Sequence, residues 1–210
     1  MFDRFLKAFP LTSGSEKEAT EQVLLPKLLS KARSAVEFFS NFEGSTFSNG
    51  LYRVHPLRGI EKWTLIIEKA FPPFKGIIKC FGYDWLGRQF ALDSSRFLDG
   101  EPLVLMFDIG TGEVLKIPTS FHDFHNLEMV DYPNDVLELK FFTEWRSAVD
   151  GEIHAHQCVG YKLPLFLNGE DDIENLEITD IEVYWELFGQ LLEQVRQLPP
   201  GAKISKINIR

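Results

Sequence analysis

The sequence lacks the features of a membrane, secreted or disulfide-bonded protein. Its two cysteines, Cys80 and Cys158, cannot build a disulfide framework, so a reducing compartment is the default. No apolar run approaches the ~20 residues that cross a bilayer. The opening residues, MFDRFLKAFP, lack the long apolar stretch of a secretory signal. We therefore expect a cytoplasmic protein with no membrane contact.

Motifs of common catalytic sites are also missing. The chain has no Gly-x-Ser-x-Gly elbow, no Gly-x-x-x-x-Gly-Lys phosphate loop and no His-Glu-x-x-His helix. Gly110-Thr-Gly112 lies in a turn between two predicted strands, and no helix N-terminus follows it to hold a phosphate. These absences favour a protein that is not an enzyme and that needs no cofactor.

Positive charge is missing from much of the C-terminal half. Residues 1–100 carry 14 Lys and Arg against 11 Asp and Glu, whereas residues 101–210 carry 8 against 20. Between Leu163 and Val195 there is no Lys or Arg at all. Phosphates would be repelled from such a region, which argues against direct nucleic-acid binding and suits a basic protein partner. The simpler alternative is a solvated acidic surface that keeps the protein soluble.

The residues that are present indicate one sizeable globular α+β domain. Hydrophobic residues make up 44% of the 210, and 19 Phe supply much of the core volume. Apolar spacing predicts helices at residues 26–42, 59–71, 120–127 and 134–148, and a last helix with a capping box at Thr179 and Glu182. Strands are predicted at residues 51–54, 77–81, 87–92, 103–109, 113–117, 154–167 and 203–209. We expect a mixed, mainly antiparallel sheet packed with helices.

A candidate metal site is formed by His154, His156 and Cys158. On one strand, alternate residues face the same side, and all three side chains are zinc ligands. Ligands on a single strand lie about 6–7 Å apart at the Cα, so tetrahedral closure needs ligands from elsewhere, such as His122 or His125. A plain half-exposed strand is the alternative that we favour.

The stretch FGYDWLGRQFALD, residues 81–93, is a second candidate site. Asp84 and Asp93 flank a bend, as a pair of catalytic carboxylates would. The simpler interpretation is structural: Asp84, Trp85, Gly87 and Arg88 build the bend, and Arg88 pairs with a nearby acid. A third hypothesis is a small-ligand pocket beside Trp85.

The run Asn168-Gly-Glu-Asp-Asp-Ile-Glu174 is acidic enough to suggest calcium. Its spacing does not match the twelve-residue EF-hand loop. A solvated acidic turn and a loop that binds a protein partner both remain open.

Several motifs resemble known families. Residues 38–54, FFSNFEGSTFSNGLYRV, resemble the opening of GAD-like domains, and FGYDWLGRQFALD resembles their central strand pair. Residues 106–114, MFDIGTGEV, followed by SFHDF at 120–124, are similar to the SUKH immunity superfamily. The stretch CVGYKLPLFLNG at 158–169, with ENL at 174–176 and VYW at 183–185, resembles the C-terminal domain of type VI secretion immunity proteins, which neutralise DNase effectors.

The resemblance implies a GAD-like N-terminal part (residues 1–110) and an immunity-protein C-terminal part (residues 111–210) within one compact unit. It implies a bacterial immunity protein that binds and blocks a cognate toxin, a basic nuclease effector. It transfers no binding residues, because such surfaces differ with each toxin. From the acidic charge we expect the toxin contacts at Glu170, Asp171, Asp172, Glu174, Asp180 and Glu182.

Overall fold

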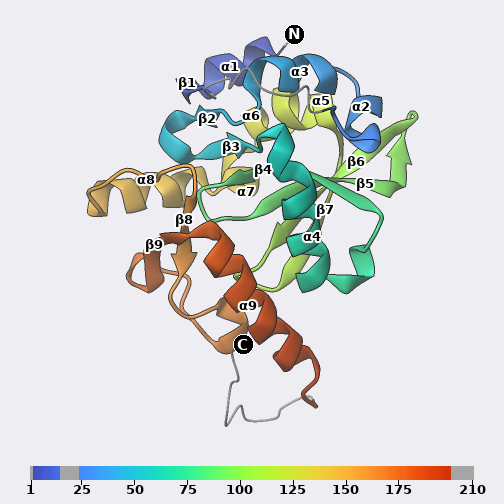
Figure 1. Cartoon of the computed structure of the whole chain (residues 1–210). Helices are drawn as coiled ribbons and strands as arrows, with labels where there is room; N and C mark the ends of the chain where they lie inside the picture. The colour runs from blue at the N-terminus through green and yellow to red at the C-terminus, as the bar shows by residue number, and fades with distance from the viewer. Residues whose placement is uncertain (1, 15–23, 200–210) are drawn as a thin grey trace.

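An antiparallel sheet, built in chain order, forms the centre of the molecule. The computed structural model describes residues 2–14 and 24–199, and in this part of the chain seven strands pair in the order β1 to β7 (Figure 1). Every neighbouring pair is antiparallel. The strands are β1 (Leu11–Ser13), β2 (Thr46–Phe47), β3 (Tyr52–Val54), β4 (Ile78–Asp84), β5 (Gln89–Leu98), β6 (Glu101–Asp108) and β7 (Glu113–Ser120). The α+β class and the mainly antiparallel sheet are therefore confirmed.

Helices cover the sheet through aromatic contacts. Phe107 on β6 lies 5.3 Å from Phe71 and 5.1 Å from Phe74, ring centroid to ring centroid, just beyond the end of α4. Phe81 and Phe90 contact the ring of Phe124 at 5.8 and 5.1 Å. The helices of the first 131 residues are α1 (Asp3–Ala8), α2 (Lys27–Lys31), α3 (Ala35–Phe42), α4 (Ile60–Ala70), α5 (Phe121–Asp123), the π-helical turn η4 (Phe124–Glu128) and α6 (Met129–Asp131). The many phenylalanines are thus used to join the helices to the sheet.

The C-terminal residues add helices and a separate hairpin. They comprise α7 (Pro133–Leu137), α8 (Leu139–Ala148), β8 (Gln157–Tyr161), the short turns η5 (Leu165–Leu167) and η6 (Ile173–Asn175), β9 (Leu176–Asp180) and α9 (Ile181–Arg196). β8 and β9 pair antiparallel in a two-stranded sheet. α9 then lies beside α4 (Figure 1). The shorter turns elsewhere are η1 (Ser48–Gly50), η2 (Leu57–Gly59) and η3 (Pro72–Phe74).

Several predicted boundaries were wrong. The helix predicted at 26–42 is broken by Ser34 at φ 65°, and the helix predicted at 134–148 is broken by Glu138 at φ 52°. Left-handed backbone interrupts the helical hydrogen bonds while leaving the apolar spacing intact. Asp180, rather than Thr179, caps α9, because its carboxylate accepts from the backbone N–H groups of Glu182 and Val183. The predicted strand at 203–209 lies outside the described residues.

The bend between β4 and β5 contains an ion pair that is fully buried. Arg88 Nε donates to Asp84 Oδ2 at 2.6 Å, and the two side chains are 5% and 0% exposed. Asp84 Oδ1 also accepts from the backbone N–H groups of Leu86 at 3.1 Å and Arg88 at 3.0 Å. Burial raises the pKa of Asp84 to about 6, although Arg88 opposes the rise. The carboxylate is still ionised at pH 7 and holds the bend in one geometry.

The same bend fastens the C-terminal elements to the sheet. Trp85 Nε1 donates to the Leu137 carbonyl at 2.9 Å, and Arg88 Nη2 donates to the Val136 carbonyl at 2.9 Å. The Trp85 carbonyl accepts from the Val159 N–H at 2.7 Å. The Gly87 carbonyl accepts from Trp185 Nε1 at 2.7 Å. We call residues 84–88 the central bend; it contacts α7, β8 and α9 at once.

Gly87 allows a direct test of the central bend. Its φ is +77°, and a Cβ there would lie 3.0 Å from Cys158 Sγ. Gly76 has the same φ of +77° but nothing within 4 Å of its Cβ position, so it is a matched control. We expect Gly76→Ala to cost about 1 kcal/mol from backbone strain alone, and Gly87→Ala to cost about 1–3 kcal/mol more from overpacking. Urea unfolding measures both, and equal losses would contradict the packing role of Gly87.

Two histidines are buried without charge. His55 is 1% exposed and its Nε2 lies 2.8 Å from Gln89 Oε1. His125 in η4 is 0% exposed; its Nδ1 donates to the Phe121 carbonyl at 2.8 Å, so its Nε2 accepts from the Tyr52 hydroxyl at 2.9 Å. Burial lowers the pKa of His55 to about 4 and that of His125 to about 3. Both imidazoles are neutral members of the core at pH 7.

These histidines predict a loss of stability in acid. Below about pH 6.5 the unfolded chain binds protons at these histidines, whereas the folded core excludes them. The free energy of unfolding is therefore highest above that pH and falls as the pH is lowered. At pH 5 each histidine should cost about 2 kcal/mol. We expect His125→Asn to lower the free energy of unfolding at pH 7 but to reduce its fall between pH 7 and pH 5.

The measurement is urea unfolding of both proteins at the two pH values. Asp84 has a raised pKa, so its protonation increases the free energy of unfolding as the pH falls below about 6. Both proteins contain Asp84, so this contribution cancels when they are compared. Parallel pH profiles would show that His125 does not contribute.

Candidate functional site

The acidic residues expected to contact a partner fall into two groups at opposite ends of the β8–β9 hairpin. Tyr161 pairs with Leu176 at one end and Gln157 pairs with Asp180 at the other. The loop that contains Glu170, Asp171, Asp172 and Glu174 precedes Leu176, whereas Asp180 and Glu182 stand at the start of α9. Five residues of extended strand put about 13 Å between these ends. The structure therefore does not bring the expected contacts into one patch.

Some of these carboxylates have roles within the fold. Asp171 Oδ1 accepts from the Tyr161 hydroxyl at 2.7 Å, and Asp172 Oδ1 caps η6 by accepting from the Asn175 N–H at 2.9 Å. By contrast, the bonds recorded for Glu170 and Glu174 use their backbone carbonyls, and both residues are exposed. Those two carboxylates are therefore the best placed in the loop to meet a partner.

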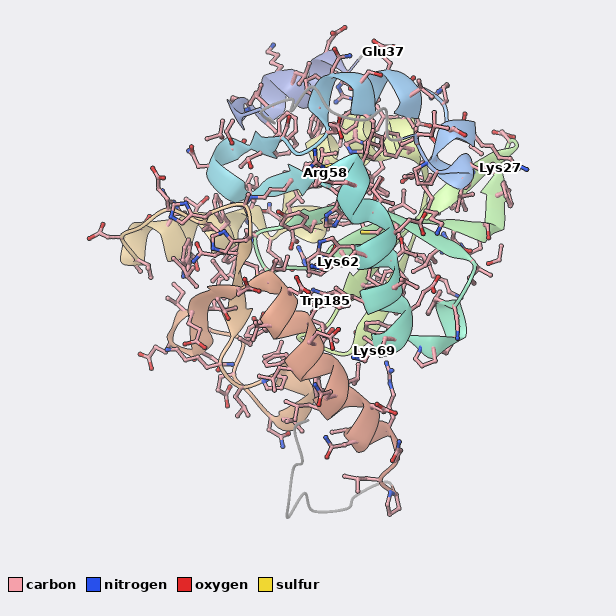
Figure 2. The ribbon with its side chains drawn as sticks, viewed as in Figure 1. Lys27, Glu37, Arg58, Lys62, Lys69 and Trp185 are labelled. Carbon is pink, nitrogen blue, oxygen red and sulfur yellow. The ribbon has the colours of Figure 1, made fainter. Side chains whose placement is uncertain are left out.

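The second group lies against α4. Asp180 caps α9, and Glu182 Oε2 pairs with Lys62 Nζ at 2.5 Å. One turn further on, Glu186 pairs with Lys69 Nζ at 2.5 Å. Figure 2 shows Lys62 and Lys69 along α4, with Trp185 on the neighbouring α9. Glu182 is thus partly neutralised, and its charge is less available than that of Glu170 or Glu174.

A further acidic cluster was missed by the sequence reasoning. Arg88 Nη1 lies 3.6 Å from Glu138 Oε1 at the break between α7 and α8. Burial raises the pKa of Glu138, with Asp171, Asp108 and Asp135 adding to the rise and Arg88 opposing it. These carboxylates come from distant parts of the chain, so no spacing in the sequence joins them.

The candidate metal site is not assembled. The predicted strand at 154–167 begins only at Gln157, so His154 and His156 lie in a turn before it. Both histidines are exposed, with their rings stacked 6.1 Å apart, whereas Cys158 is 0% exposed and burial raises its pKa. The assumption that the three side chains share one face was therefore wrong. Within residues 2–14 and 24–199, no group of three or more His, Cys, Asp or Glu is arranged to hold a metal ion.

The other two candidates in residues 81–93 also lack support from the geometry. Asp84 ends β4, and Asp93 pairs with Ile78 at its start, so the two acids are about 20 Å apart and cannot act on one bond. Asp93 accepts instead from the Ser95 N–H at 2.8 Å. Trp85 is fully buried. An open hollow of about 430 Å³ lies elsewhere, between the ends of α4 and α9 and the start of β7.

None of the described helices is long and apolar enough to cross a membrane.

Comparisons with known proteins agree with this architecture. No curated protein matches the chain. Among solved structures, the "Crystal structure of Atu4351 from Agrobacterium tumefaciens" has a TM-score of 0.62 at 16% sequence identity, over 90% of this chain and 89% of that chain. At that identity the likeness shows the fold alone.

A family model gives the more specific result. The model described as "T6SS immunity protein Tdi1, C-terminal" matches residues 119–192. The matched stretch runs from the end of β7 into α9 and includes both groups of acidic residues. Residues 119–192 are therefore similar to the C-terminal domain of a type VI secretion immunity protein, which confirms the resemblance seen in the C-terminal motifs.

Proposed function

We propose that this protein neutralises a cognate type VI effector, a nuclease, by binding the effector and covering its active surface. The observation that carries the proposal is the match of residues 119–192 to an immunity-protein family. The protein would act by occlusion in the bacterial cytoplasm and would transform no substrate. The division into a GAD-like part (residues 1–110) and an immunity part (residues 111–210) remains part of this proposal.

The charge distribution supports a nuclease as the target. A nuclease must attract phosphates, so its active face is positive. The acidic loop at 170–174 lies within the matched residues, and its exposed Glu170 and Glu174 carboxylates are available to such a face. An acidic inhibitor competes for that face directly and associates rapidly through electrostatic steering. The same charge disfavours direct binding of nucleic acid by the inhibitor itself.

Co-expression tests the function directly. Cells that produce the effector encoded beside this gene should lose viability. Co-production of this protein should restore growth, and the protein should co-purify with the effector. DNA integrity in the same cells reports whether the toxin is a nuclease. Survival without any complex between the two proteins would contradict neutralisation by occlusion.

Charge reversal tests the electrostatic part. We expect Glu174→Lys to slow association with the inactivated effector about threefold or more at low salt, with the difference shrinking as salt is raised. Glu37→Lys makes the same change of charge on α3, which Figure 2 shows away from α9, and it is the matched control. Equal effects of the two variants on the association rate, measured by stopped flow, would locate the contact elsewhere.

A further inference from the structure

The loop of residues 150–156, between α8 and β8, has no helix or strand but is held at several carbonyl groups. Arg53 Nη2 donates to the Ile153 carbonyl at 2.5 Å, and the Tyr83 hydroxyl donates to the Ala155 carbonyl at 2.6 Å. Arg146 donates to the Gly151 carbonyl. Donors therefore bind alternate carbonyls of the loop: Arg53 and Tyr83 do so from the buried side, and Arg146 does so at the surface.

Both ends of the loop are fixed as well. The Val149 N–H donates to the Trp145 carbonyl of α8 at 2.9 Å. The His156 carbonyl accepts from the Ile181 N–H at 3.0 Å, which ties the loop to the start of α9. A loop held in this way has lost its conformational freedom during folding, so a partner that binds it has little ordering cost to overcome.

The loop is held by a buried arginine, Arg53, which has no acidic partner among the described residues. Arg53 is 2% exposed, and its recorded acceptors are the carbonyls of Gly50, Ile153 and Gln157. Among the described residues no carboxylate pairs with it, and its Nε has no hydrogen-bond partner. Burial lowers the pKa of this guanidinium. A buried cation without a counter-charge costs stability, so its use beneath a surface loop points to a requirement for the loop's shape.

The outer side of the loop carries side chains that the fold does not use. His154 and His156 are exposed, and their rings stack in parallel, 6.1 Å apart with 5° between their planes. Asp150 and Glu152 are exposed on the same loop, and Val183, 60% exposed, stands on the adjoining first turn of α9. Aromatic rings with flanking carboxylates suit an arginine, whose planar guanidinium stacks on rings and pairs with acids.

We propose that the 150–156 loop is a preformed contact surface for an arginine-bearing face of the effector, with His154 and His156 at its centre and Arg53 as the residue that positions it. This inference rests on the proposed function and names a surface that the acidic sequence pattern does not reveal.

The test compares variants of the full chain by calorimetric titration with the inactivated effector. We expect His154→Ala/His156→Ala to weaken binding about tenfold or more. Phe97→Ala removes an exposed ring, 51% exposed, on β5 outside the matched residues, and should leave binding within about twofold. If the unmodified chain does not bind, the proposed function fails. If it binds and the double variant binds equally well, only the loop inference is overturned.

Two further variants test the positioning role. Tyr83→Phe removes one donor from the buried side of the loop, and Arg53→Met removes the second buried donor together with its charge. Both should speed hydrogen exchange of the amides at 151–156 and weaken effector binding, without touching the partner directly. Faster exchange with unchanged affinity would overturn the role of a preformed loop. If Arg53→Met does not fold, Tyr83→Phe alone decides the question.

If the histidine variant loses self-association but still binds the effector, the surface contacts a second copy of this chain. That result would also overturn the inference.

Discussion

The buried pair of Asp84 and Arg88 is the constraint on which the arrangement of the C-terminal residues depends. A buried ion pair adds little net stability, because desolvation offsets the attraction, but it permits few geometries. Here that geometry lets Trp85 and Arg88 donate hydrogen bonds to α7. It also lets the carbonyls of Trp85 and Gly87 accept hydrogen bonds from β8 and α9. Losing Arg88 would leave the Asp84 carboxylate buried alone, and losing Asp84 would leave Arg88 with only Glu138, 3.6 Å away, as a counter-charge. The sheet therefore determines where the residues that match the family model lie, although they form their own hairpin.

The functional surfaces follow from that arrangement. Residues 119–192 present acids at two separated places, and the β8–β9 hairpin sets the distance between them. At one end lies the exposed loop with Glu170 and Glu174; at the other lies the loop with His154 and His156. A partner that met both ends would span the whole hairpin. The rigid elements beneath allow the loops to differ in sequence without disturbing the core.

Much of the fold could be predicted from the sequence, because strands and helices leave periodic patterns. The antiparallel hairpins and the helix at 60–70 were found in this way. The breaks at Ser34 and Glu138 could not be found, because both residues adopt left-handed backbone inside a continuing apolar pattern. The start of β8 was placed too early because His154, His156 and Cys158 recur at every second position, as residues on one face of a strand do. Alternation shows which residues can share a face, but not where pairing begins.

The candidate site was less accessible than the fold. The acids at 170–174 are adjacent in sequence, and composition alone singles them out. The influence of Asp108, Asp135 and Asp171 on the pKa of Glu138 depends on the fold, because these residues are spread over more than sixty positions of the sequence. Arg53 looked like an ordinary strand residue, since nothing in its neighbourhood shows that it will be buried beneath a loop more than ninety residues away.

The ion pairs between α4 and α9 have a consequence for the first approach of another molecule. Lys62 and Lys69 offset Glu182 and Glu186 on that flank, whereas none of the ion pairs among the described residues involves Glu170 or Glu174 at the other end of the hairpin. A molecule with its charge distributed in this way has an electric dipole and experiences a torque near a positive body. The electric field would therefore orient the protein with its exposed carboxylates toward the positive body before the two molecules make contact.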